Sequence, residues 1–140
     1  MGYYMKVLVA HPAQQHSYEL ATALELAGYL DTYATTVYYK KNNWTYLITS
    51  LLKGSMKKRA QNRICEGIAK KKVKQFCEMK GLLTLLAIHN PIVNKYYKKL
   101  KYYTADCFAK KVARYVIKNK IDIVITYDDT SPVLFEILGE

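Results

Sequence analysis

The sequence predicts an α/β fold in which helices cover a small, Rossmann-like parallel sheet. Three short apolar segments, at 5–10, 33–39 and 121–127, have the composition of buried strands. The segments between them repeat apolar residues at helical spacing. With 140 residues, 51% of them hydrophobic, the chain has the size and composition of one domain with a core. We therefore expect a single domain over 1–140 with an incomplete sheet of about three strands.

The first two strands are predicted to form a βαβ crossover. Residues 5–10 (MKVLVA) contain a continuous apolar run, which is typical of a central strand buried on both faces. A helix is expected from about Gln14 to Ala27, with Gly28 placed to end it. The second strand, 33–39 (YATTVYY), is rich in β-branched and aromatic residues. The spacing of these segments fits a crossover between parallel strands.

The third strand, 121–127 (IDIVITY), is expected beside the first. It runs into Asp-Asp-Thr-Ser-Pro, where Thr130 or Ser131 can cap a final helix that has Pro132 in its first turn. A doubly wound sheet of only three strands would be incomplete at this edge.

The region between the second and third strands, about 44–119, is predicted to be a basic helical insert. Helices are expected at 69–89, broken before Pro91, and at 93–119. An earlier helix carries one apolar stripe, made of Trp44, Leu47, Ile48, Leu51 and Leu52. We favour packing of this stripe on the sheet. The alternative is a membrane interface, because the basic cluster Lys57-Lys58-Arg59 follows it.

The positive charge of the chain is concentrated in this insert. The formal net charge is +11, and 53–120 holds 19 of the 22 Lys and Arg residues but three of the 11 acids, which leaves +16 there and −5 elsewhere. Such a charge predicts attraction to polyanions, which include nucleic acid, acidic lipid headgroups and phosphorylated substrates. No apolar run approaches the ~20 residues needed to span a bilayer.

The cysteines indicate neither a disulfide framework nor a zinc site. Cys65, Cys77 and Cys107 are odd in number, form no CxxC pair and follow no recognisable signal peptide. We interpret them as reduced thiols of a cytoplasmic protein, and we expect no metal.

Two polar clusters follow predicted strands. The first consists of His11, Gln14, Gln15, His16 and Ser17, and the second of Asp128, Asp129, Thr130 and Ser131. Ligands of open parallel sheets bind outside the carboxyl ends of the strands, so both clusters are expected to line one cleft. The structural alternatives are helix capping for Ser17, Thr130 and Ser131, and ordinary turn roles for the aspartates. There is no GxGxxG or Walker sequence to indicate dinucleotide or P-loop binding.

Two families with a His-Pro pair after the first strand fit less well. Zinc-dependent deacetylases of the LmbE-like family carry acids directly after this pair, where the present sequence has Ala13 and Gln14. Flavodoxin-like quinone reductases also begin with a strand, His-Pro and a serine, but the basic helical middle and the missing flavin loops depart from their pattern. The reductase domain remains an alternative.

The chain resembles the N-terminal half of a GT-B glycosyltransferase, of the family-4 type that builds bacterial surface polysaccharides. The stretches that carry the resemblance are "VLVAHPAQQHSYELATALELAGYLDTYATTVYY", "KKRAQNR" and "IDIVITYDDTSPVLFE", of which the first is the most specific. The family pattern implies two Rossmann-like domains that face each other across a cleft. The N-terminal domain holds the acceptor, the C-terminal domain holds the nucleotide-sugar donor, and no metal takes part.

The resemblance also implies roles for individual residues. His16 and Asp128 would act at the reaction centre, while His11, Gln14, Gln15, Ser17, Asp129 and Thr130 would bind substrate. Trp44, Lys57, Lys58, Arg59 and Arg63 would hold the enzyme against anionic lipid on the inner face of the plasma membrane, where a lipid-linked acceptor is presented. The C-terminal donor domain is absent from these residues. We therefore expect a truncated product or one half of a split enzyme, inactive alone.

A nucleic-acid-binding module is the non-enzymatic alternative. Fourteen tyrosines and the basic insert could place rings on bases and lysines on phosphates. No recognised nucleic-acid motif is present, and many of the tyrosines fall at apolar helix or strand positions, where burial explains them. We therefore expect no nucleic-acid partner.

Overall fold

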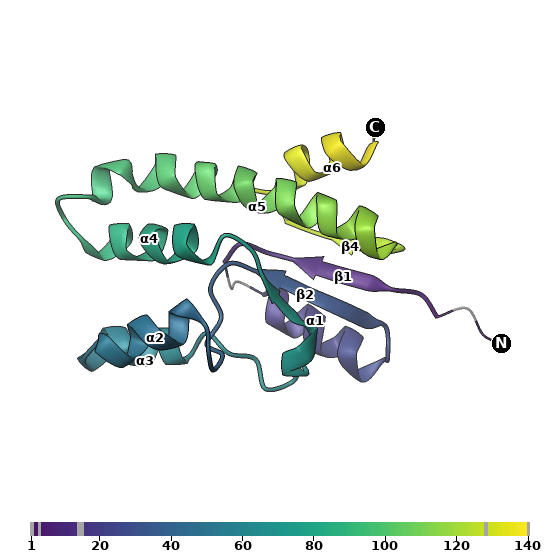
Figure 1. The fold of residues 1–140 in the computed structure, drawn as a ribbon, viewed down its shortest axis with the longest axis horizontal. Coiled ribbons are helices and arrows are strands. Elements are labelled where there is room, and N and C mark those ends of the chain that lie inside the picture. Colours follow the sequence, from purple (N-terminus) through teal and green to yellow (C-terminus); the bar gives the residue numbers. More distant parts are fainter. Residues whose placement is uncertain (1, 3, 14–15, 128, 140) are drawn as a thin grey trace.

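The computed structural model describes residues 2, 4–13, 16–127 and 129–139. Four parallel strands, ordered β3-β2-β1-β4, form one sheet with helices on both faces (Figure 1). The predicted α/β class with a parallel sheet is confirmed. The strands are β1 (Val7–Ala10), β2 (Leu30–Thr35), β3 (Val73–Gln75) and β4 (Ile123–Ile125). The helices are α1 (Ser17–Leu26), α2 (Trp44–Leu51), α3 (Gly54–Gln61), α4 (Glu78–His89), α5 (Tyr97–Asn119) and α6 (Ser131–Gly139), with 3-10 turns at Lys70–Lys72 and Asn94–Tyr96.

The prediction of about three strands is wrong by one. Strand β3 lies in the segment that the sequence assigned to a helix over 69–89, where the α-helical part is α4 and a 3-10 turn precedes β3. It pairs with β2, opposite Tyr33, Ala34 and Thr35, and of its three residues only Val73 is buried. A three-residue edge strand flanked by lysines has no alternating pattern to detect, so the lysine-rich composition suggested a helix instead.

Strand β1 is buried on both faces, as its apolar run predicted. Leu8 and Ala10 pack with Phe108 of α5 and Leu134 of α6, while Val9 packs with α1 and β2 on the opposite face. Alternate residues of a strand point to opposite faces, so one strand supplies both cores. Figure 1 shows α1 on one side of the sheet and α5 with α6 on the other.

The strand order positions the site. Strand β4 pairs with β1, with Leu8 opposite Val124, which confirms the expected neighbourhood of the first and last predicted strands. The order of the strands reverses between β1 and β4, because the chain passes from β1 to β2 on one side and arrives at β4 on the other. Gly28 ends α1 as predicted, with a positive φ of 78°. A crevice is expected outside the carboxyl ends of β1 and β4.

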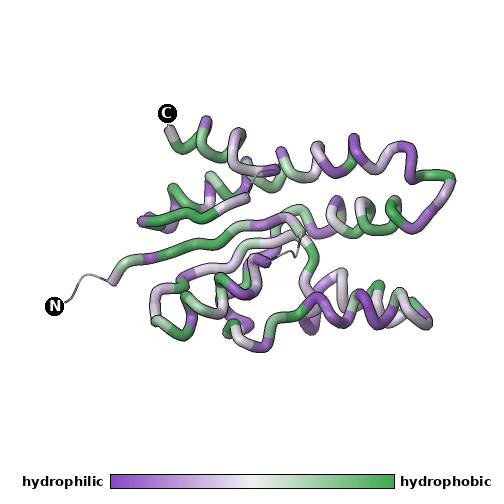
Figure 2. The backbone as a smooth tube through the Cα atoms, turned by 180° about the vertical axis from the view of Figure 1, so that it is seen from behind, coloured by the Kyte–Doolittle hydropathy of each residue, from purple (hydrophilic) through white to green (hydrophobic). Residues whose placement is uncertain are grey.

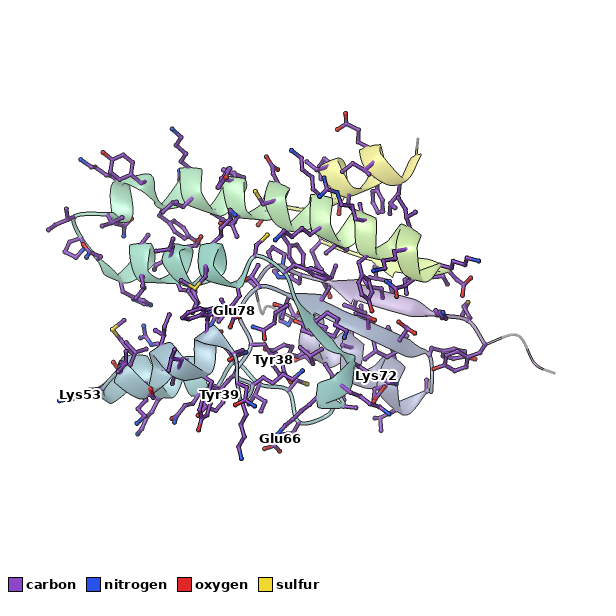
Figure 3. The ribbon with its side chains drawn as sticks, in the orientation of Figure 1. Tyr38, Tyr39, Lys53, Glu66, Lys72 and Glu78 are labelled. Atoms are coloured by element: carbon purple, nitrogen blue, oxygen red, sulfur yellow. The ribbon has the colours of Figure 1, made fainter. Side chains whose placement is uncertain are left out.

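The helical insert projects past this carboxyl edge (Figure 1). Helices α4 and the first half of α5 lie side by side there, and α2 and α3 lie on the other side of α4. The residues of α3 and of the outer part of α5 are largely hydrophilic, whereas the residues of β1 are hydrophobic (Figure 2). Glu78, at the start of α4, accepts hydrogen bonds from the backbone N–H (2.7 Å) and the hydroxyl (2.6 Å) of Thr45 at the start of α2 (Figure 3). The carboxylate thus joins two insert helices.

The prediction that the apolar stripe of α2 packs in the core is wrong for three of its residues. The exposed fractions of Trp44, Leu47 and Leu51 are 53%, 53% and 77%. The buried residues of α2 are instead Thr45 and Thr49. Periodicity identified an apolar face, but the Glu78 contact turns the threonine side of the helix inward.

Candidate functional site

A pocket of about 220 Å³ opens at the carboxyl edge of the sheet, where the strand order reverses. We call it the edge pocket. Segment 11–13 after β1, Thr36 after β2 and Asp129 after β4 form its sheet side. The insert supplies the opposite side, and the side chains used below are Arg63, Thr84, Leu85, Lys101 and Thr104. The pocket therefore lies between the sheet and the insert.

His11 is a rigid part of this pocket. Its side chain is buried, and its Nδ1 accepts a hydrogen bond of 2.8 Å from the backbone N–H of Ala13. Its ring meets the ring of Tyr127 edge to face, with 4.8 Å between centroids. Because Nδ1 accepts, the proton of the neutral imidazole resides on Nε2. His11 is thus held in one tautomer and one orientation, as a positioning group requires.

Asp129, after β4, and Lys101, on α5, both line the edge pocket. The Asp129 carboxylate, after β4, lies 2.9 Å from the Lys101 ammonium on α5. The hydrogen bond to Asp129 raises the pKa of the Lys101 ammonium above its ordinary value. Asp129, predicted to bind substrate, therefore lines the pocket, and its charge is shared with a lysine that the sequence had not singled out.

Three threonine hydroxyls line the wall of the edge pocket. Thr36 donates to the carbonyl of Pro12 over 2.5 Å. Thr84 on α4 lies 3.1 Å from Thr104 on α5, oxygen to oxygen. Each hydroxyl keeps acceptor capacity beyond the bond that it donates. Hydroxyls, one carboxylate and one ammonium form a surface suited to a polyhydroxylated ligand.

Gly81 lets α4 approach the end of β2. A Cβ built at this position would lie 2.5 Å from Thr36 Oγ1 and 2.9 Å from Val37 Cγ2. Contacts this short cannot be relieved by a flexible side chain, because Thr36 and Val37 are both buried. The absence of a side chain at Gly81, which lines the edge pocket, therefore permits this close packing.

Arg63 lies in the pocket wall. The sequence grouped it with Lys57, Lys58 and Arg59 as part of a membrane patch, but Lys58 and Arg59 are exposed on α3 whereas Arg63 is half-buried. Burial lowers the pKa of the Arg63 guanidinium, and the nearby Tyr18 and Tyr33 oppose that shift. Among the acids of the described ranges, none lies within ion-pair distance of it. A partly desolvated guanidinium without a carboxylate partner favours an anionic ligand.

Several predicted site residues lie elsewhere. His16 is 89% exposed and lies 3.7 Å from Glu19, outside the lining of the edge pocket. The buried Ser17 hydroxyl hydrogen-bonds to Tyr33 Oη at 2.8 Å. Thr130 is buried and bonds to Thr126 and to the carbonyl of Tyr127. Gln14, Gln15 and Asp128 are outside the described residues.

The capping role considered for Ser17 is also not observed. Helix α1 has His16 at its N-cap, without a side-chain capping bond. The Ser17 hydroxyl instead bonds to Tyr33 of β2 inside the core.

Sequence reasoning missed the pocket residues of the insert: Gly81, Thr84, Lys101 and Thr104. Two signals were present. A glycine inside an apolar helix indicates close approach of another backbone, and a threonine on an otherwise apolar helix face indicates a hydrogen bond or a ligand.

Comparison with known proteins found no matching family model, no similar characterised protein and no similar solved structure. Within the part of the chain that the structure describes, no three His, Cys, Asp or Glu side chains are grouped closely enough to hold a metal ion. Across the same ranges, no helix combines the length and hydropathy needed to cross a membrane.

Proposed function

We propose that this chain is the acceptor-binding half of a metal-independent GT-B glycosyltransferase. It would hold a lipid-linked or saccharide acceptor while a second domain or a separate subunit supplies the nucleotide-sugar donor. The observation that carries the proposal is the edge pocket, which lies where the strand order reverses and is lined by hydroxyls and an ion pair. Because the donor site would belong to that second domain or subunit, these 140 residues alone would be inactive.

The described residues suggest how the acceptor is positioned. The Lys101–Asp129 pair would hydrogen-bond to acceptor hydroxyls, and His11, held by the backbone N–H of Ala13, would fix the loop beside them. Fixed groups of this kind accelerate transfer by orienting the reacting hydroxyl toward the donor. His16 and Asp128 keep the reaction-centre roles that the resemblance implies. His16 is exposed at the start of α1.

The insert would hold the enzyme at the membrane. Trp44, Leu47 and Leu51 expose an apolar face, and Lys57, Lys58 and Arg59 follow on the next helix. Lys53, in the turn between α2 and α3, lies at the outer end of this unit (Figure 3). Apolar groups beside basic ones suit the interface of an anionic bilayer, where each Lys or Arg contributes about 1 kcal/mol. This arrangement supports a peripheral location on the cytoplasmic side of the plasma membrane.

Titration of the ¹⁵N-labelled chain with a saccharide panel and with nucleotides tests the acceptor role. Saccharides are expected to shift the amide signals of Ala13, Thr36, Gly81 and Lys101, whereas nucleotides leave these signals unchanged. A Lys101→Gln variant should lose saccharide binding, and Lys110→Gln, on the exposed side of the same helix, should not. Nucleotide shifts confined to the edge pocket would contradict the proposal.

A second candidate function, nucleic-acid binding, is favoured by three tyrosines in α5 and in the 3-10 turn before it. Tyr96, Tyr102 and Tyr103 are exposed, and a lysine ammonium lies 4.9 to 5.9 Å from the centre of each ring. Aromatic rings among lysines are a surface on which single-stranded nucleic acid can stack. Oligonucleotide binding that weakens steeply with salt would favour this alternative.

A further inference from the structure

A second pocket, of about 100 Å³, lies among α2, α3 and α4. We call it the helical pocket. Its apolar wall includes Ile48, Leu52, Met56, Leu82, Leu85 and Leu86. Leu82, Leu85, Leu86 and His89 follow one face of α4 at i, i+3, i+4 and i+7 spacing, so the helix presents a continuous apolar stripe that ends in a histidine. The interior of the pocket suits a hydrocarbon group.

The polar side chains that line this pocket are mostly basic. They are Arg59, Arg63, His89 and Thr49, and no acidic residue is among the lining residues of the described chain. The Thr49 hydroxyl donates to the carbonyl of Thr45 at 2.5 Å. Neither arginine is within ion-pair distance of an acid in the ranges described. An apolar interior with unpaired cations at its rim complements a molecule that carries a hydrocarbon chain and an anionic head.

Arg63 connects the helical pocket with the edge pocket. Both pockets are lined by Arg63 and by Leu85, which therefore stand at the boundary between them. A head group at the Arg63 guanidinium would have its chain on the side of α2 and α3 and its remaining substituents on the side of His11 and Lys101. One ligand could thus use both pockets.

We propose that the helical pocket binds the hydrocarbon chain of an alkyl or isoprenoid phosphate, with the phosphate at Arg63 and the rest of the head group in the edge pocket. The idea that this molecule is the sugar acceptor rests on the proposed function. The prediction that the molecule binds to the helical pocket does not. Phosphate fits better than carboxylate, because its non-bridging oxygens can engage both Arg59 and Arg63, and the guanidinium fork matches phosphate oxygens.

The size of the helical pocket limits what it can hold. A cavity of about 150 Å³ lined by aliphatic and aromatic side chains accommodates benzene. At about 100 Å³, the pocket takes a few methylene groups, with the rest of a longer chain leaving through its open side. Affinity should therefore rise with chain length and then level off, which distinguishes a pocket from a membrane surface.

The test is titration of the chain with ethyl, butyl, hexyl and octyl phosphate, monitored by calorimetry and by amide shifts. Affinity is expected to rise by up to about fourfold for each buried methylene over the first few carbons, and then to level off. Hexanol and inorganic phosphate should each bind more weakly than hexyl phosphate. Equal affinities across the series, or equal binding of hexanol and hexyl phosphate, would overturn the proposal.

Two pairs of variants locate the ligand. Ala60 lines the helical pocket from α3, so Ala60→Phe should fill it and abolish the dependence on chain length, while Ala23→Phe on the exposed face of α1 should not. Arg63→Gln should reduce hexyl phosphate affinity at least tenfold, and Arg114→Gln, an exposed position on α5, should leave it unchanged. Unaltered binding by both pocket variants, with circular dichroism confirming that they fold, would contradict the assignment.

The outcome is separable from that of the proposed function. Saccharide shifts at the edge pocket test the acceptor role, and the alkyl phosphate series tests the helical pocket. Mixed phosphatidylcholine and phosphatidylglycerol vesicles form a third arm. Ala60→Phe should lose hexyl phosphate but still bind these vesicles through the exposed face of α2. If affinity depended on alkyl chain length only when vesicles are present, the alkyl chain would be bound by the bilayer, and the helical pocket would be excluded.

Discussion

The sheet and the helical insert use apolar side chains in opposite ways. In the sheet region, which here includes α6 and the second half of α5 that pack on the sheet, Leu8, Phe108 and Leu134 are fully buried between strands and helices. In the insert, Trp44, Leu47 and Leu51 of α2 are exposed, although they form one apolar stripe. Hydrophobic burial is the main source of stability, so the sheet region is the part that holds the fold together. The exposed residues of the insert contribute little to this stability, and they are the ones that we propose contact a membrane.

The largest expected effect contrasts these two uses directly. Phe108→Ala should lower the free energy of unfolding by about 3–5 kcal/mol, because it empties a fully buried site beneath Leu8 and Ala10. Leu51→Ala, at a position that is 77% exposed, should change it by at most about 0.5 kcal/mol. Denaturant unfolding measures both. Similar losses in the two variants would mean that the insert contributes to the core as much as the sheet does.

The second effect probes the junction between the two regions. Gly81→Ala should destabilise the chain by about 1–3 kcal/mol, although alanine favours helix, because the added methyl group collides with Thr36. Gly139→Ala is the matched control, since a Cβ there has no neighbour within 4 Å. It should be neutral or slightly stabilising. If Gly81→Ala were equally harmless, α4 would not pack closely on the end of β2.

A smaller effect should remain within the insert. Glu78→Gln weakens the charged hydrogen bonds that hold the start of α2, so it should cost about 1 kcal/mol and increase amide exchange in α2 more than in β1. Glu66→Gln, at an exposed acid, serves as the control. Faster exchange in β1 than in α2 would show that Glu78 supports the whole fold rather than the insert.

The smallest effect at neutral pH concerns the tyrosines beneath the sheet. Burial raises the pKa of the Tyr18 hydroxyl above its ordinary value of 10.0, with Tyr33 and Tyr38 adding to the shift. The unfolded chain therefore loses this proton first, and stability should fall as pH rises above about 10. Tyr18→Phe should match the wild type at neutral pH and lose less stability above pH 10. Identical pH profiles of unfolding would contradict the burial of this hydroxyl.

The apolar pattern of the strands predicted the fold class, and the polar residues that follow the strands predicted part of the candidate site. The apolar run at 5–10 identified a central strand, and the polar residues after it and after 121–127 included His11 and Asp129, which line the edge pocket. These features follow from the local sequence and from the geometry of parallel sheets. The site could be anticipated on the sheet side for that reason.

The insert side could not be anticipated in the same way. Lys101 reaches the pocket from α5 and Arg63 from the segment after α3, and no local pattern specifies how these elements pack at the carboxyl edge. The stripe on α2 predicted an apolar face but not which part of the protein that face contacts. The hydrogen bond from Thr45 to Glu78 holds the opposite, threonine side of α2 toward α4. Strand β3 was missed because three residues are too few to establish a period.

The most direct test of the account uses Trp44, the single tryptophan of the chain, as a reporter of the insert. Its fluorescence should shift to shorter wavelength on addition of anionic phosphatidylglycerol vesicles. It should respond little to neutral vesicles or to oligonucleotides, and replacing Lys57, Lys58 and Arg59 together with glutamine should weaken the shift. No response to anionic vesicles, or an equal response to oligonucleotides, would contradict the claim that the insert is a membrane-contact surface carried on a sheet scaffold.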